Sequence, residues 1–350
     1  MSTLLRSPKT LAVLVVAGVV FIVSLAGGAL GNEFGGGFLA SPIAHIQLPA
    51  ESITSGSLFA DFQITNTMVT TWLAILFLVV ISVLATRRLK DVPTGLQNVV
   101  EIVIEGFLNL AESVAGPGRA RKFFPLIMTI FLFIVTANWM GILPGFGTIG
   151  RIEPAEEVVH HLEESGDEVD LADVRLQLFD GDGSFAVVAF GSVDDEITAL
   201  EVEEHGVKEG QQAGLLVPFL RSANTDVNMT LAIALVAMTM IHFWGFSTLG
   251  FFGHMGKFVN FKQGPIGLFV GLLEAISEVA RVISFTFRLF GNMFAGEVLL
   301  VAMAFLLPLI GIIPFLGLEL FVGVIQAFIF SMLTLVFATM ATVSHGAEEH

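Results

Sequence analysis

The chain has 350 residues, of which 54% are hydrophobic and only 14% are charged, and its mean hydropathy is +0.83. Soluble domains carry about 25% charged residues, so this composition excludes an ordinary soluble protein and predicts a membrane protein. The absence of cysteine excludes a disulfide framework, thiol catalysis and a cysteine-ligated metal. The net charge of −16 is concentrated in residues 150–215, which hold 18 acidic and 3 basic side chains, and the rest of the chain is nearly neutral.

Several apolar runs are long enough to cross the hydrocarbon core, which takes about 20 helical residues. They cover residues 10–29, 67–86, 125–145, 226–250, 265–300 and 315–341. The first run follows two basic residues and ends in small residues, a pattern typical of either a cleaved signal peptide or a retained anchor. We expect an all-α polytopic membrane protein with about five core helices plus this N-terminal segment.

The runs and the loops between them predict the regions of the chain. These are an anchor or signal peptide (1–30), an extracytoplasmic segment (31–66), membrane helices (67–149), an acidic insert (150–215), a membrane helix with a cytoplasmic loop (216–264), a tilted helix hairpin (265–341) and a tail (342–350). Basic residues gather on the cytoplasmic side of membrane proteins. If Arg6 and Lys9 are inside, the rule predicts that the insert lies outside and that the C-terminus lies in the cytoplasm. We expect a multi-pass protein of the plasma or inner membrane.

Residues 92–113 have apolar side chains at helical spacing, with Glu101, Glu105 and Glu112 between them. This pattern predicts an amphipathic helix, which either lies along the cytoplasmic membrane surface or is a solvated connector packed on its neighbours. Pro125 is expected to open the next membrane helix, because its missing N–H does no harm at a first helical position.

The sequence of the acidic insert predicts a small α/β or β-rich module outside the membrane. Helical spacing runs from Glu153 to Glu164. Alternating patterns predict strands at 174–179 and 184–190, with a third at 197–202.

The run 265–300 is unusually long for a membrane helix. A helix of this length reaches about 54 Å, whereas the hydrocarbon core is about 30 Å thick. The helix must therefore tilt or bend, and Gly291 or Gly296 offers a place to bend.

Glu274, Glu278, Arg281, Arg288 and Asn292 follow one another in this run at steps of four, three, seven and four. They form one polar stripe on a helix, and ionisable groups within the membrane mark ion paths or proton relays. The alternative is that the first three residues merely pair with one another.

Arg288 is the most informative residue of the stripe. Its guanidinium stays charged, and placing it at a helix centre in the bilayer costs roughly 2.5–3.5 kcal/mol on insertion scales. The nearest carboxylates on its own face are ten and fourteen residues away, so its partner is expected on another chain. Glu297 follows on the opposite face, about 13 Å further along the helix. Glu319 and Gln326 share a face of the last run.

The run from Arg288 to Glu297, Arg-Leu-Phe-Gly-Asn-Met-Phe-Ala-Gly-Glu, resembles the signature of the a subunit of rotary F-type ATP synthase. That subunit is the stator half of a membrane ion channel. The similarity continues in Val92-Pro93-Thr94-Gly95, Thr129-Ile130-Phe131, Gly141-Ile142-Leu143-Pro144, Asp226-Val227-Asn228-Met229-Thr230 and Gln326-Ala327-Phe328-Ile329-Phe330. The resemblance covers roughly residues 65–150 and 215–345.

The resemblance implies roles for individual residues. Arg288 resembles the essential arginine that faces the ring of c subunits and meets its membrane carboxylate. The other residues implied in ion translocation are Glu297 and Glu319 lining one half-channel, Asn292 and Gln326 beside the arginine, and Glu274 near the other half-channel, with Glu278, Arg281, Ser284, Asp226 and Asn228 in support.

The resemblance also implies the partners and the kind of activity. The partners are the c-subunit ring, the b subunits, other synthase subunits and the lipid bilayer, with no nucleic acid. The subunit couples proton translocation to ring rotation and is not itself an enzyme, and neither a cofactor nor a metal site is expected. The sequence contains no Gly-x-x-x-x-Gly-Lys-Ser/Thr nucleotide-binding motif, which agrees with this division of labour.

This chain departs from the family pattern in three places. Many relatives place a histidine at one of the positions held by Glu297 and Glu319, whereas this chain has glutamate at both. Two nearby carboxylates titrate as a coupled pair. The N-terminal apolar run and the acidic insert are also unusual.

Two other functions are compatible with parts of the sequence. An ion-coupled secondary transporter also places charges at the membrane midplane, but it should show internal repeats. A membrane-anchored binding protein would place its specificity in the acidic insert and would need no charge within its helices. Replacement of Arg288 distinguishes this second alternative from a stator subunit, because a binding protein should keep its function whereas a stator should lose coupled transport.

Overall fold

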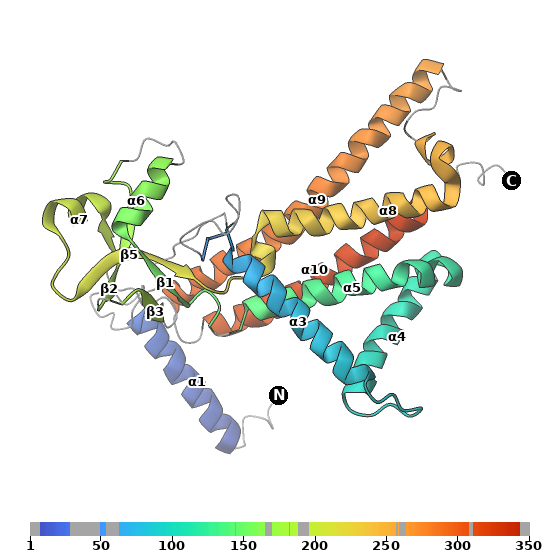
Figure 1. Cartoon of the computed structure of the whole chain (residues 1–350). Coiled ribbons are helices and arrows are strands. Elements are labelled where there is room, and N and C mark those ends of the chain that lie inside the picture. The colour runs from blue at the N-terminus through green and yellow to red at the C-terminus, as the bar shows by residue number, and fades with distance from the viewer. Residues whose placement is uncertain are drawn as a thin grey trace. The chain divides into compact units, whose positions relative to one another are not determined.

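The computed structural model describes residues 8–28, 50–53, 63–143, 145–164, 170–181, 183–187, 196–256, 258, 264–307 and 311–343 (Figure 1). The long helices are α1 (Pro8–Gly27), α3 (Asn66–Thr86), α4 (Leu96–Ala115), α5 (Pro117–Gly141), α8 (Val227–Met255), α9 (Gly264–Leu306) and α10 (Ile312–Ala341). Among the described residues, α3, α5, α8 and α10 are long and apolar enough to cross a membrane. This mostly helical architecture fits an all-α polytopic membrane protein.

The chain forms two compact units. Unit 1 consists of Met1–Val69, Gly141–Arg221 and Ala295–Leu320, and unit 2 consists of Thr70–Met140, Ser222–Phe294 and Phe321–His350. Most of the predicted extracytoplasmic segment 31–66 and of the tail 342–350 lies outside the described residues.

Helix α9 is one uninterrupted helix of 43 residues, about 65 Å long. It continues beyond the predicted run to Leu306, and it does not break at Gly291 or Gly296. Helical glycines lower stability by roughly 1 kcal/mol relative to alanine, but they do not by themselves interrupt the hydrogen bonds of a helix.

The apolar core of unit 2 lies between α5, α8, α9 and α10. Phe285 and Leu289 of α9 are buried with Ile134 of α5, Ala237 of α8 and Phe330 of α10. The rings of Phe285 and Phe330 have their centroids 4.6 Å apart.

Within unit 2, α9 and α10 run antiparallel. The guanidinium carbon of Arg281 lies 4.7 Å from the centre of the Phe337 ring. Further along α9, the side chain of Asn292 forms a hydrogen bond with the side chain of Gln326 on α10. Residues later in α9 therefore contact residues earlier in α10, as expected for antiparallel helices.

The prediction that Pro125 opens a helix is wrong, because α5 begins at Pro117 and contains Pro125. Pro117 takes the first helical position, where a missing N–H is harmless. Gly116 precedes it with φ 77°, a backbone conformation that ends α4.

The expected amphipathic helix is α4, displaced a few residues toward the C-terminus of the predicted range 92–113. Phe107 and Ala111 are buried in the core of unit 2, whereas Val99 and Ile102 are exposed. Its position along the membrane surface stays a prediction.

The insert contains a five-stranded antiparallel sheet in unit 1, with the strand order β3-β1-β5-β2-β4. The strands are β1 (Ile149–Pro154), β2 (Arg175–Asp180), β3 (Phe185–Val187), β4 (Glu196–Thr198) and β5 (Gln211–Pro218). Helices α6 (Ala155–Glu164) and α7 (Ala199–His205) contribute Val158 and Ala199 to the apolar core beneath the sheet.

Several details of the insert differ from the sequence-based expectation. Residues 153 and 154 end β1, so the first helix starts two residues later than predicted. The expected strand 197–202 is mostly helical because Thr198 and Glu201 form a capping box that starts α7. The third difference is that β1 and β5 were not predicted. In the expected strand 184–190, residues 188–190 lie outside the described residues.

Candidate functional site

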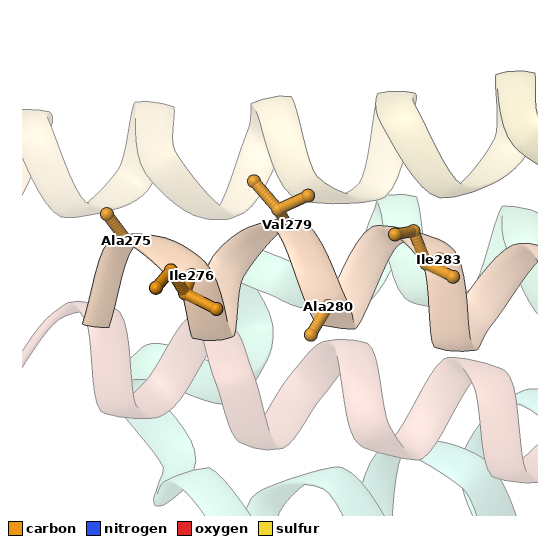
Figure 2. A pocket seen from close by; sticks show the side chains of 5 residues that line it. All are labelled: Ala275, Ile276, Val279, Ala280 and Ile283. Atoms are coloured by element: carbon orange, nitrogen blue, oxygen red, sulfur yellow. The ribbon is translucent and has the colours of Figure 1, made fainter. Parts of the chain in front are cut away.

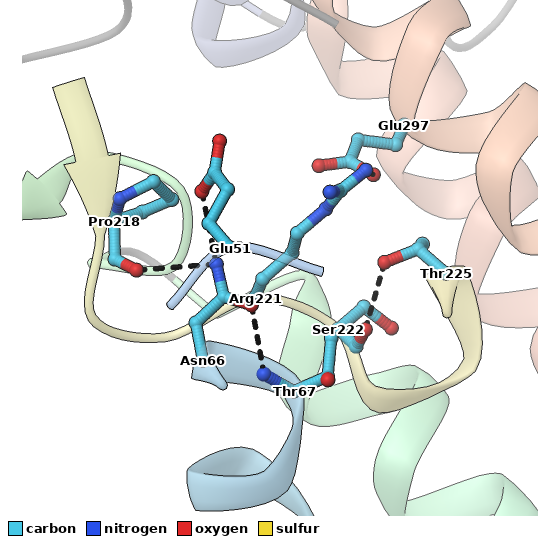
Figure 3. Close-up of polar contacts among 8 residues, drawn as sticks. All are labelled: Glu51, Asn66, Thr67, Pro218, Arg221, Ser222, Thr225 and Glu297. Carbon is cyan, nitrogen blue, oxygen red and sulfur yellow. Dashed lines mark hydrogen bonds and ion pairs between the residues drawn. The ribbon is translucent and has the colours of Figure 1, made fainter. Parts of the chain in front are cut away.

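A polar cluster in unit 1 surrounds the buried side chain of Arg221 (Figure 3). A terminal nitrogen of Arg221 lies 3.4 Å from a carboxylate oxygen of Glu297 on α9, and the Arg221 side chain is 6% exposed. The Asn66 side-chain amide donates to the Glu51 carboxylate at 3.0 Å and to the Pro218 carbonyl at 3.2 Å. The cluster therefore joins the start of α3, the end of β5 and the C-terminal part of α9.

Glu51 titrates near neutral pH. Burial raises the pKa of its carboxyl from 4.5 to about 7, and the negative charge of Glu297 acts in the same direction. The positive charge of Arg221 and the hydrogen bond from Asn66 oppose that rise. The cluster thus holds a carboxyl that can exchange a proton at physiological pH.

The raised pKa of Glu51 predicts that the folded protein loses stability as pH rises. Below about pH 4.5 the carboxyl is protonated in both states, and between there and about pH 7 only the unfolded state ionises, which costs on the order of 3 kcal/mol. We expect Glu51→Gln to flatten this dependence, as measured by the thermal unfolding midpoint of the purified complex against pH. Glu156→Gln, at an exposed position, is the control. An unchanged pH dependence in Glu51→Gln would contradict the assignment.

Glu297 and Glu319 are neighbours in unit 1, and their charges interact. Glu319 of α10 is half-buried, and its carboxylate lies against Gly296 of α9. A Cβ atom at position 296 would overlap all three atoms of that carboxylate group. The absence of a side chain at Gly296 therefore creates the space that Glu319 occupies.

Two amide side chains connect α9 and α10 in unit 2. The Asn292 amide donates to the Gln326 side-chain oxygen at 2.8 Å, and Gln326 is buried whereas Asn292 is exposed. Asn138 of α5 takes part in two further hydrogen bonds. Its side-chain oxygen accepts from the Asn224 amide at 2.6 Å, and its side-chain nitrogen donates to the Gly323 carbonyl of α10 at 3.2 Å. These bonds fix α10 against α5 and α9.

Arg288 lies on α9 in unit 2 and is partly exposed. Its guanidinium donates a hydrogen bond to the Ser284 hydroxyl, one turn earlier, at 3.4 Å. No carboxylate in the part of the chain that the structure describes forms an ion pair with Arg288.

The three charged residues in the N-terminal half of α9 pair with one another, as the alternative interpretation of the sequence expected. Arg281 lies 3.6 Å from Glu274 and forms a close ion pair with Glu278. The side chain of Glu278 is 16% exposed and that of Glu274 is 43% exposed. Glu278 also contacts a histidine, His242 of α8, at 3.8 Å.

Asp226 is the N-cap of α8, and its carboxylate accepts a hydrogen bond from the backbone N–H of Asn228 at 2.9 Å. A carboxylate at this position satisfies an orphan donor and complements the helix dipole. The structure thus gives Asp226 a role in starting α8.

Sequence reasoning missed the polar contacts made by Glu51, Arg221, His242 and His254. Arg221 is 76 positions from Glu297, and no local pattern links the two. His242 and His254 are twelve positions apart in one helix, yet their rings form a hydrogen bond at 3.2 Å. The two histidines can meet because Gly250, with φ 73°, kinks α8 between them, and this glycine is the sequence feature that could have indicated the contact.

Comparisons with known proteins give a consistent result. A family model described as ATP synthase A chain matches residues 68–339. Proteins named ATP synthase subunit a are similar over most of their length. The one from Gloeobacter violaceus is 29% identical over 280 residues, which are 80% of this chain and 85% of that protein. The one from Solidesulfovibrio magneticus is 27% identical over 86% of this chain and 95% of its own length. Because the family model covers most of the chain, this protein belongs to the ATP synthase A chain family.

Proposed function

We propose that this chain is the stator subunit of the proton channel in a rotary F-type ATP synthase, and that Arg288 couples proton movement to rotation. The family membership supports the role of the subunit. The observation that carries the role of Arg288 is its permanent charge on α9 without an ion-paired carboxylate among the described residues, where its hydrogen-bond partner is Ser284.

Arg288 acts on a carboxylate that the rotating ring presents. An ionised ring carboxylate is attracted to the guanidinium, and a protonated one can turn away into lipid because it is neutral. The fixed positive charge also makes direct passage of a proton past Arg288 costly. Each proton driven through the full potential yields about 2.3 kcal/mol per 100 mV, which the ring converts into rotation.

The polar cluster of unit 1 forms one half-channel. Glu297 and Glu319 supply adjacent carboxylates on α9 and α10, and Arg221 lies against Glu297. Glu51 adds a carboxyl whose pKa is about 7, so it exchanges protons with water at physiological pH. In unit 2, the hydrogen bond between Asn292 and Gln326 orients two amides on the same pair of helices.

The other half-channel lies beside the N-terminal half of α9. Glu274 is its partly exposed carboxylate, and Arg281 lies between Glu274 and Glu278. We assign this half-channel to the cytoplasmic side and the cluster of unit 1 to the extracytoplasmic side. The insert then lies outside and the C-terminus lies in the cytoplasm, as the distribution of basic residues predicts.

An apolar face of α9 is suited to contact the ring and lipid. Small and branched side chains spaced three or four residues apart line a shallow hollow of about 380 Å³ (Figure 2), namely Ala275, Ile276, Val279, Ala280 and Ile283. Ile276, Val279 and Ile283 are each more than half exposed. Exposed apolar surface of this kind is stable against lipid or another membrane helix. The b subunits are further proposed partners of this chain, and the nucleotide chemistry belongs elsewhere in the complex.

ATP-driven proton pumping by the complex in vesicles tests the proposed function. The measurement compares wild type with Arg288→Ala at equal assembly of the complex. Loss of pumping in the variant would support Arg288 as the coupling residue, whereas retained pumping would remove the basis of the proposal.

A further inference from the structure

One edge of the sheet in the insert exposes apolar side chains. Phe185 and Val187 of β3 are 56% and 62% exposed, and they lie on the same face because successive side chains of a strand alternate. Ala186, between them, points to the other face and packs against Ile152 and Phe179. An edge strand that exposes apolar side chains promotes association unless something covers it.

The neighbouring strands extend this apolar surface. Val187 pairs with Ile149 of β1, and the backbone N–H of Phe219, directly after β5, donates to the Ile149 carbonyl at 2.9 Å. The rings of Phe185 and Phe219 are stacked, with their centroids 6.0 Å apart. Ile149 and Phe219 are partly exposed. We call these four residues, Ile149, Phe185, Val187 and Phe219, the β3 patch.

The β3 patch lies at the end of the sheet that meets a membrane helix (Figure 3). Asn66, the first residue of α3, donates a hydrogen bond to the carbonyl of Pro218, the residue before Phe219. Helix α3 is long and apolar enough to cross a membrane, so Asn66 marks the level at which the chain enters the hydrocarbon. The sheet therefore brings its exposed apolar edge to the level of the membrane surface.

The distribution of charge in the sheet favours the same orientation. Strand β3 has the sequence Phe-Ala-Val and carries no charge. Strand β4 forms the opposite edge and leads into α7, where Glu201, Glu203 and Glu204 are exposed. Carboxylates are costly to remove from water, whereas apolar side chains gain from leaving it. One edge of the sheet is thus suited to lipid and the other to water.

The size of the β3 patch favours lipid over a protein partner. A stable protein–protein interface takes about 20–30 residues from each side, whereas the β3 patch has four side chains. A bilayer surface needs no matching shape, and a few apolar side chains suffice when a neighbouring helix already holds the protein in the membrane.

We propose that the β3 patch inserts into the bilayer surface and holds the acidic insert against the lipid. Phe185 and Val187 enter the boundary between headgroups and acyl chains, where apolar faces lie about 5–10 Å deep. Strand β4 and helix α7 stay in water. This contact involves lipid alone and does not depend on the coupling role of Arg288.

The test uses a fluorescent label on a single cysteine. The chain contains no cysteine, so Val187→Cys gives it one site for an environment-sensitive fluorophore. The assembled complex is placed in vesicles whose lipids carry bromine either near the headgroup or at the end of the acyl chain. We expect the headgroup-proximal bromines to quench the label more strongly, at a depth of about 5–10 Å, and iodide on both sides of the membrane to quench it little.

The matched control is Leu200→Cys, at an apolar residue of α7 that is 37% exposed. Its label should be quenched by iodide and not by brominated lipid. The complex without an introduced cysteine is the blank for labelling of other subunits. A Val187→Cys label quenched by iodide as strongly as the control would overturn the proposal, and so would protection from both quenchers, which would show that protein covers the β3 patch.

A second variant tests whether the apolar side chains cause the insertion. Phe185→Asp, combined with the labelled Val187→Cys, places a charge beside the label. Position 185 is exposed, so the sheet should stay folded. We expect most of the lipid quenching to be lost and iodide quenching to rise to the level of the control. Unchanged lipid quenching would show that the β3 patch does not hold the strand in the membrane.

Discussion

Arg288→Ala is expected to abolish ATP-driven proton pumping without loss of the assembled complex. The loss should be on the order of a hundredfold to a thousandfold, as for removal of a charge-stabilising donor at a reacting centre. The guanidinium is partly exposed and is hydrogen-bonded to Ser284, so its removal leaves no buried carboxylate among the described residues without its ion-pair partner. Taking an arginine out of a membrane helix also removes an insertion cost of roughly 2.5–3.5 kcal/mol.

The same variant should increase passive proton leak, because the electrostatic barrier between the half-channels is removed. Leak is measured as the decay of an imposed pH gradient in vesicles that hold equal amounts of the complex. Arg175→Ala is the matched control, since it removes an arginine from an exposed position of the insert. Normal pumping with Arg288→Ala, or an equal loss with Arg175→Ala, would be incompatible with the role of Arg288.

Gly296→Ala is expected to lower proton pumping by about a hundredfold through displacement of Glu319. The new Cβ atom overlaps the Glu319 carboxylate, which must rotate away. Misplacing a reacting group by about 1 Å can cost on the order of a hundredfold in rate. The overlap is with the end of a flexible side chain, so the helices can stay in place and the complex should assemble normally.

A double-mutant cycle separates this mechanism from a general packing effect. If Gly296→Ala acts through Glu319, it should have little further effect when Glu319 is already alanine. Gly106→Ala is the control, because a Cβ atom on this helical glycine of α4 meets nothing within 4 Å. Additive losses in the double variant, or normal pumping by Gly296→Ala, would show that the position of Glu319 does not matter.

The sequence by itself determined the class of the protein and the placement of its main charges. Runs of about 20 apolar residues have few stable conformations other than helices in a membrane, so α3, α8 and α10 were predictable within about five residues. Helix α5 was also expected, but it begins at Pro117, eight residues before the predicted run. The stripe that contains Arg288 was also predictable, because the spacing of residues along one helix fixes which of them share a face. The pairing of Arg281 with Glu278 follows from the same local spacing.

Only the tertiary structure decided which distant groups meet. Glu297 pairs with Arg221, and Gly296 leaves space for the Glu319 side chain. Both contacts form between segments that are distant in the sequence, and no local sequence pattern predicts them. His254 reaches His242 through a single glycine with positive φ, a conformation that the sequence permits but does not require. Helical periodicity is a local property and can be read along the chain, whereas contacts between elements depend on packing that is settled only when the whole chain folds.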